Sequence, residues 1–237
     1  MADFLLVHGS CHGAWCWRDL IPALEAQGHT TRAIDLPGMG ADQTPLGEVT
    51  LDSCRKAVLA ASTPDTLIVG HSWGGYPISA AAEDAPDAVR GLIYLCAYFP
   101  KDGLSMVERR RAAPHQPLVD AVLKSKDGLS YTIDSSRAPD LFYHDCMPDT
   151  VNYAMQHLCP QPIAPQATSL PTGAAFSSVP KSYIRCANDR TIPPEYQIEM
   201  TRDWPADRVH VMETSHSPFL SDPRGLAMLL TQIERQF

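Results

Sequence analysis

Ser72 lies between glycines in the segment Gly-His-Ser-Trp-Gly-Gly, residues 70–75, which directly follows the apolar run 67–69. The pattern G-x-S-x-G between a strand and a helix is typical of a serine held in a sharp turn, where its neighbours must be small and its hydroxyl projects above the sheet. Residues 74–85 have a helical pattern, and the first amide groups of such a helix would point toward the serine. The segment therefore predicts a nucleophilic serine, whereas the same letters in a loop would indicate only a flexible turn.

A serine hydroxyl is a poor nucleophile unless a base, oriented by a third group, removes its proton. Of the nine histidines, His216 follows the last predicted strand and precedes the last predicted helix. The chain order serine, acid, histidine then requires an acid after the preceding strand, and Asp189 stands there. Asp222 is placed instead as the N-cap of the last helix. We therefore predict that Ser72, His216 and Asp189 act together, with Ser72 attacking a carbonyl carbon.

The tetrahedral intermediate of such an attack needs hydrogen-bond donors for its oxyanion, usually two backbone N–H groups. We expect them from Trp73, the residue after the nucleophile, and from Ser10 in the loop after the first strand. His8 opens that loop and is assigned a supporting role. The aromatic residues Phe142 and Tyr143 are candidates for lining an apolar substrate pocket. This chemistry requires no metal and no cofactor.

The elements that must position these residues follow from the hydrophobic pattern. Short apolar runs rich in β-branched residues alternate with helical patterns. Six such runs are predicted as strands: 4–7, 30–35, 66–70, 89–98, 181–187 and 208–213. Continuous apolar strands separated by helices predict an α/β fold, with a mostly parallel sheet of about six strands covered on both faces. Such sheets bind ligands beyond the carboxyl ends of their strands, where the candidate residues stand.

The alternation is interrupted between residues 99 and 180, which is too long for a structureless loop. We predict that 1–98 and 181–237 form the core, and that 99–180 is an inserted, mainly helical cap with its return linker. The proline-rich stretch 160–180 is the linker.

Composition restricts the class of protein. The chain has 237 residues, of which 44% are hydrophobic and 19% charged, and its net charge is −8. An acidic chain whose only basic cluster is 109–111 is a poor candidate for nucleic-acid binding. No run of about 18 apolar residues and no leader pattern is present, so a cytoplasmic protein without membrane contact is expected. The seven scattered cysteines indicate reduced thiols, and Cys11 and Cys16 are too few for a zinc site.

These motifs resemble the α/β-hydrolase fold, and more narrowly the plant methylesterase and hydroxynitrile lyase family together with small bacterial esterases. The resemblance is carried by the segments LLVHGSCHGAWCW, LEAQGHTTRAIDLPGMG, GHSWGG, LFYHDC and ANDRTIPPEYQ. It runs nearly end to end and is weakest between about 100 and 140. It implies the catalytic triad Ser72, Asp189 and His216 with the oxyanion-hole amides of Ser10 and Trp73.

The same resemblance favours an esterase. The lyases carry a threonine and a lysine at the positions of Gly9 and Ser217, and without the cation the lyase reaction lacks its main electrostatic stabilisation. The expected partner is therefore a small-molecule ester that the protein hydrolyses. Three alternatives stay open: hydrolysis of a lactone, carbamate or C–C bond by the same triad, a hydroxynitrile lyase, and a non-catalytic binding protein. The divergent cap leaves the substrate undetermined, and the sequence leaves the oligomeric state open, a homodimer included.

Overall fold

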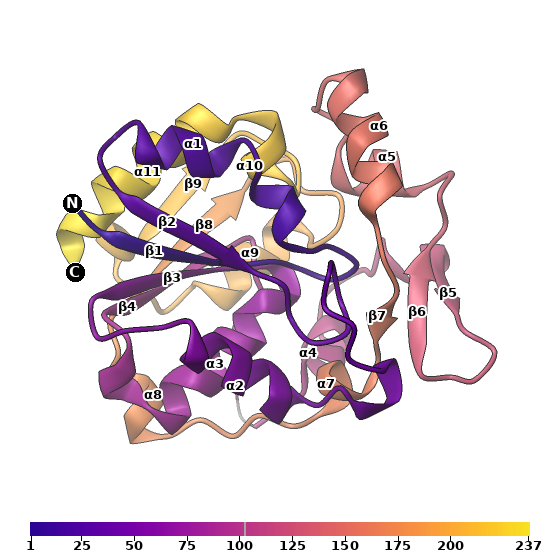
Figure 1. Ribbon diagram of the computed structural model, residues 1–237, viewed down its shortest axis with the longest axis horizontal. Helices are drawn as coiled ribbons and strands as arrows, with labels where there is room; N and C mark the ends of the chain where they lie inside the picture. The colour runs from indigo at the N-terminus through magenta and orange to yellow at the C-terminus, as the bar shows by residue number, and fades with distance from the viewer. Residues whose placement is uncertain (102) are drawn as a thin grey trace.

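A six-stranded parallel sheet forms the centre of the molecule (Figure 1). The structure is a computed structural model, and it describes residues 1–101 and 103–237. The strands are β1 (Asp3–Val7), β2 (Thr30–Ile34), β3 (Thr66–His71), β4 (Gly91–Leu95), β8 (Lys181–Cys186) and β9 (Val209–Met212), in the spatial order β2-β1-β3-β4-β8-β9. Every neighbouring pair is parallel. The predicted fold is confirmed, and the fourth strand alone is clearly shorter than its predicted range.

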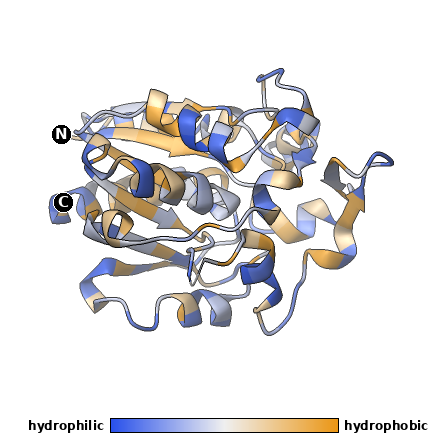
Figure 2. Ribbon diagram, turned by 90° about the horizontal axis from the view of Figure 1, so that it is seen from below, coloured by the Kyte–Doolittle hydropathy of each residue, from blue (hydrophilic) through white to orange (hydrophobic). Residues whose placement is uncertain are grey.

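Helices cover both faces of the sheet, which explains why its strands are apolar on both sides. In β1, Phe4 and Leu6 belong to one apolar cluster, whereas Leu5 and Val7 belong to the other, as the two-residue period of a strand requires. The first face is covered by α1 (Leu20–Glu25), α10 (Pro218–Ser221) and α11 (Pro223–Ile233), and the second by α2 (Leu51–Ala60), α3 (Gly75–Asp84) and α8 (Ala174–Ser178). Figure 2 shows the resulting layers, with hydrophobic strands between helices of mixed character.

Side-chain caps determine where two of these helices begin. Thr50 and Ser53 form a reciprocal capping box at the start of α2, with the Thr50 side chain accepting from the Ser53 amide at 3.0 Å. At the start of α11, the Asp222 carboxylate accepts from the Gly225 amide at 2.9 Å, and Pro223 occupies the first turn. The predicted capping role of Asp222 is thus what the structure shows.

The chain leaves the central sheet after β4 and returns to it at the adjacent strand β8, and the segment between them extends beyond one end of the sheet (Figure 1). Its main elements are α4 (Met106–Arg111), β5 (Val122–Lys124), β6 (Ser130–Ile133), α5 (Ala138–Phe142), α6 (Pro148–His157), β7 (Gln161–Pro162) and α7 (Ala164–Ala167). We call this segment the cap. The three strands form a small antiparallel sheet in the order β5-β6-β7, which the hydrophobic pattern did not predict.

The two termini lie together at the end of the sheet opposite the cap (Figure 1). The N-terminal ammonium of Met1 lies 3.6 Å from the Glu234 carboxylate. Within residues 1–101 and 103–237, no helix is long and apolar enough to traverse a bilayer.

Candidate active site

The predicted site residues follow the carboxyl ends of four strands of the central sheet, and this arrangement brings them together from distant parts of the chain. Ser10 lies in the loop after β1, Ser72 directly follows β3, Asp189 follows β8 and His216 follows β9. Because parallel strands end at one edge of the sheet, these loops meet there, beneath the cap.

Ser72 occupies a strained turn between β3 and α3. Its φ angle is +53°, in the left-handed region that side chains disfavour, and its exposed fraction is 6%. The neighbouring glycines are required because a β-carbon at Gly70 would lie 2.9 Å from the Gly74 carbonyl oxygen, and one at Gly74 would lie 2.7 Å from the Val7 carbonyl oxygen. The Ser72 carbonyl accepts from the Tyr98 amide at 3.1 Å. The turn is thus held by packing on both sides, and the hydroxyl makes no hydrogen bond to any described residue.

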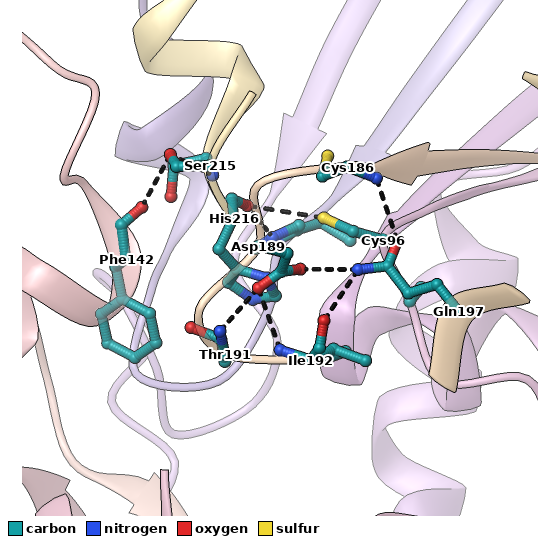
Figure 3. A network of polar contacts seen from close by, with 12 residues as sticks. Cys96, Phe142, Cys186, Asp189, Thr191, Ile192, Gln197, Ser215 and His216 are labelled. Carbon is teal, nitrogen blue, oxygen red and sulfur yellow. Dashed lines mark hydrogen bonds and ion pairs between the residues drawn. The ribbon is translucent and has the colours of Figure 1, made fainter. Parts of the chain in front are cut away.

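His216 is buried and is held through both its backbone and its ring. Its carbonyl accepts a hydrogen bond from His71 Nε2 at 2.9 Å, and Cys96 Sγ lies 3.5 Å from the same oxygen (Figure 3). His216 Nδ1 lies 2.7 Å from Asp189 Oδ2. Since the carboxylate accepts, Nδ1 carries the proton, which leaves Nε2 with a free lone pair. His216 therefore has the tautomer that a general base for a hydroxyl needs.

Asp189 is surrounded by donors (Figure 3). One carboxylate oxygen accepts from the amides of Thr191 at 2.6 Å and Ile192 at 2.9 Å. The other accepts from Gln197 Nε2 at 2.9 Å in addition to His216. Gln197 lies on α9 (Pro194–Met200), so this helix and the turn before it hold the carboxylate in one orientation. The four donors thus satisfy the buried carboxylate and fix its orientation toward His216.

The two candidate oxyanion-hole residues both lie near Ser72. Trp73 stands in the single 3-10 turn Ser72–Gly74 that leads into α3, where the first N–H groups have no partner within the helix. Ser10 lines the same cavity as Ser72 and His216. Its hydroxyl accepts from Gln166 Nε2 at 2.7 Å, and Gln166 in turn accepts from the Tyr131 hydroxyl at 3.0 Å. Two cap residues therefore help to hold this loop.

A histidine that sequence reasoning left unassigned supports the same loop. His12 Nδ1 lies 2.7 Å from the Ser10 carbonyl, which can only accept, so the proton is on Nδ1 and Nε2 accepts from the Tyr143 hydroxyl at 2.7 Å. Burial lowers the pKa of His12 to about 3, so the ring is neutral at ordinary pH. Burial, reinforced by the neighbouring His216 and His12, also holds the pKa of His71 well below its usual value.

The cavity at Ser72 is small and largely enclosed. Its volume is about 20 Å³, and its lining consists of Ser10, Ser72, Tyr98, Met106, Arg110, Leu118, Tyr131, Phe142, Thr191 and His216. Phe142 thus lies where a pocket residue was predicted, and its ring stacks on His216 with centroids 5.9 Å apart. Tyr143 does not line this cavity, because its hydroxyl is bound to His12 instead.

Larger hollows lie elsewhere on the surface. One of about 450 Å³ lies beside Phe176 and Trp204, and another of about 460 Å³ lies beside Tyr143 and Arg190. Neither is lined by Ser72 or His216. The chemistry therefore belongs to the small cavity.

Sequence reasoning missed several of the supporting residues. Gln197 and Thr191 hold Asp189, and His71 holds the His216 backbone. A signal for His71 was present in the sequence, because His71 stands directly before the nucleophile in the serine motif. A side chain at that position can reach the loop that carries His216. Gln197 lies in a helix with no distinguishing pattern, and only the fold brings it to Asp189.

Comparison with known proteins shows which family the chain belongs to. A sequence profile described as "Alpha/beta hydrolase family" matches residues 4–229. The chain is 31% identical to Methylesterase 10 of Arabidopsis thaliana over 253 residues, covering 99% of this chain and 92% of that protein. It is 30% identical to a pyrethroid hydrolase of Sphingobium wenxiniae, covering 96% of this chain and 85% of that protein.

Solved structures give the same relationship. Polyneuridine aldehyde esterase superposes with a TM-score of 0.86 at 25% identity, covering 98% of this chain and 99% of that one. A pyrethroid hydrolase of Sphingobium faniae superposes with a TM-score of 0.85 at 28% identity, covering 99% of this chain and 97% of that one. The backbone is therefore shared along the whole length, cap included.

Proposed function

Because this chain belongs to the alpha/beta hydrolase family, we propose that it is a serine carboxylesterase that cleaves a small ester through an acyl-enzyme. The observation that carries the proposal is the placement of Ser72 and His216 around one cavity, with His216 Nδ1 bound to Asp189 at 2.7 Å. Relatives named as methylesterases and as a pyrethroid hydrolase support an ester as the bond that is cleaved.

In the proposed reaction, Ser72 Oγ attacks the ester carbonyl carbon while His216 Nε2 takes the hydroxyl proton. The amides of Ser10 and Trp73 bind the oxyanion of the tetrahedral intermediate. The bond to the alkoxy oxygen then breaks, and His216 gives its proton to the departing alcohol. Water attacks the acyl-enzyme by the same route and releases the acid, so the cycle consumes one water and restores Ser72. Asp189 keeps the histidine in the required tautomer throughout.

Two residues argue against the hydroxynitrile lyase alternative. A β-carbon at Gly9 would lie 2.7 Å from His71 Nδ1 and 2.9 Å from Ser72 Cβ, so this position has no room for the threonine side chain of the lyases. Ser217, at the lyase lysine position, is buried and supplies no cation. Hydrolysis of a lactone, a carbamate or a C–C bond by the same three residues stays an alternative to hydrolysis of a simple ester.

A cytoplasmic location and action without membrane or nucleic-acid partners complete the proposal. The seven free thiols support a reducing compartment. The net charge of −8 is unfavourable for binding to phosphate backbones.

The deciding experiment compares wild type with Ser72→Ala on short p-nitrophenyl esters, aryl methyl esters and a lactone. We expect turnover by wild type only, together with covalent labelling of wild type by a fluorophosphonate and mass-spectrometric location of the label at Ser72. Equal turnover by both proteins would contradict the role of Ser72. If wild type is neither active nor labelled, a cyanohydrin assay and a ligand-binding screen would test the lyase and the binding protein.

A further inference from the structure

Arg110 stands in the wall of the catalytic cavity, and the reaction proposed above gives it no role. It is the second of three consecutive arginines in α4 and lines the cavity together with Ser72 and His216. Its neighbours have other surroundings. Arg109 Nε donates to the Phe99 carbonyl at 3.1 Å, whereas the side chain of Arg111 is exposed to solvent.

The guanidinium of Arg110 has no counter-ion among residues 1–101 and 103–237. None of the ion pairs formed within these residues includes Arg110, and its Nε is buried without a hydrogen-bond acceptor. Arg110 is half-buried, and a cation partly removed from water beside a cavity is stabilised when an anion joins it. The nearby hydroxyls of Tyr98 and Tyr131 cannot serve as that anion, because burial raises the pKa of both and keeps them neutral.

The rest of the lining is apolar or uncharged. Met106, Leu118 and Phe142 provide carbon surface, and no carboxylate is among the lining residues. A guanidinium has a planar arrangement of donors that matches a carboxylate, and one cation balances one negative charge. The cavity thus combines a nucleophile, an apolar wall and one unpaired cation.

We propose that the substrate is a small ester that carries a second, ionised carboxylate, and that Arg110 binds this carboxylate while Ser72 attacks the ester. This inference rests on the proposed esterase function and specifies its substrate class. The apolar residues would contact the carbon chain between the two groups. Arg110 is accordingly a specificity determinant rather than a participant in bond cleavage.

The test uses two matched pairs of esters, since the carboxylate could lie on the acyl or on the alcohol side. The acyl pair is the mono-p-nitrophenyl ester of adipic acid and p-nitrophenyl hexanoate, which have equal chain lengths. The alcohol pair is 4-acetoxybenzoate and 4-methylphenyl acetate. For each pair the ratio of kcat/KM, anionic over neutral ester, is corrected for spontaneous hydrolysis and measured in wild type, Arg110→Met and Arg111→Met.

We expect wild type to prefer the anionic ester of at least one pair, and Arg110→Met to lower that ratio about 10- to 100-fold, as the loss of a charge-assisted hydrogen bond would. Arg111→Met removes a neighbouring charge from the same helix but not from the cavity, so its ratio stays within about twofold of wild type. Arg110→Lys, which keeps the charge but not the fork of donors, should give an intermediate ratio.

A second measurement covers the case in which Arg110→Met does not fold. Adipate should inhibit wild-type hydrolysis of p-nitrophenyl hexanoate competitively, whereas hexanamide, of similar length but uncharged, should not. Two outcomes would overturn this inference but leave the esterase function standing. In the first, wild type hydrolyses the neutral esters and prefers neither anionic ester. In the second, Arg110→Met leaves the ratio of kcat/KM, anionic over neutral ester, unchanged. Absence of turnover on all four esters would overturn the esterase function and this inference with it.

Discussion

The backbone of Ser72 is held at a φ of +53°, and this strain can be measured separately from catalysis. Ser72→Gly and Ser72→Ala both remove the nucleophile, but only glycine adopts the left-handed region without a steric penalty. After allowance for the greater chain entropy of unfolded glycine, we expect Ser72→Gly to be more stable than Ser72→Ala by about 1 kcal/mol. Urea unfolding of the two inactive variants makes the comparison. If the turn stored no strain, Ser72→Gly would be the less stable variant, by the chain-entropy cost of glycine.

Ser72, His216 and Asp189 are expected to act as one unit. Ser72→Ala, His216→Ala and Asp189→Asn should each lower kcat by about 10⁴-fold or more, and the triple variant should be little worse than the worst single one. Ester hydrolysis with active-site titration measures this. Asp222→Asn serves as the control, because Asp222 caps α11 and asparagine caps equally well. Multiplicative losses in the triple variant would show independent roles.

At the residue level, chain order and strand ends were enough to select the main candidates. Ser72, Asp189 and His216 each follow a strand that the hydrophobic pattern predicts, so sequence position implied spatial proximity. The supporting contacts have no such signal. Gln197 reaches Asp189 from the first turns of a helix, and Arg110 reaches the cavity from a cap helix whose packing depends on the entire insertion.

The packing of the turn between β3 and α3 against β1 makes a prediction about elements. A β-carbon at Gly74 would lie 2.7 Å from the Val7 carbonyl and 2.8 Å from the His8 carbonyl, both of them backbone atoms that cannot rotate away. Gly74→Ala should therefore push this turn away from the sheet, at a cost of about 1–3 kcal/mol in the free energy of unfolding. It should also lower kcat, because the Trp73 amide moves with the turn.

Gly47→Ala is the matched control for that substitution. Its β-carbon would lie 3.3 Å from Leu129 Cδ1, the end of a side chain that can adjust. Stability and kcat should both stay close to wild type. If Gly74→Ala behaves in the same way, the close approach of this turn to β1 is unimportant for the site.

Among the elements, the central strands were predictable and the cap strands were not. The inner strands β1, β3 and β4 are apolar runs buried on both faces, so each carries its own signal. The edge strands β2 and β9 are less buried, but each still contains β-branched residues. In the cap, β5 has three residues and β7 has two, one of them Pro162, which is too short for any periodicity to appear. The pairing of β7 with β6 also depends on segments about 30 residues apart meeting in space, as Tyr131 does with Gln161.

For the molecule as a whole, buried neutral histidines predict how stability depends on pH. Burial lowers the pKa of His8, His12 and His71 below the value of about 6.5 that they have in the unfolded chain. As pH falls below 6.5, the unfolded chain therefore binds protons that the folded protein does not, and stability decreases. These three groups alone give a slope of up to about 4 kcal/mol per pH unit, at about 1.4 for each proton. His29 and His210, whose pKa burial also lowers, add to it in the same direction.

Urea unfolding between pH 7 and pH 5 measures this slope before most carboxylates titrate. His12→Gln should reduce it by up to about 1.4 kcal/mol per pH unit, since one of the three groups is removed. His115→Gln is the control, because the His115 side chain is 58% exposed and its loss should leave the slope unchanged. A stability that does not change over this range would show that the three rings are hydrated in the folded protein.

The cavity of about 20 Å³ at Ser72 has room for one water molecule but for no ester. We therefore expect the cavity to widen, by displacement of the cap, before an ester binds. Every measured affinity is then the intrinsic affinity multiplied by the fraction of molecules that are open. The hydrogen bonds from Tyr131 through Gln166 to Ser10 join the cap to the core. Because Gln166 does not line the cavity, weakening these bonds at Gln166 should raise apparent affinity by increasing the open fraction.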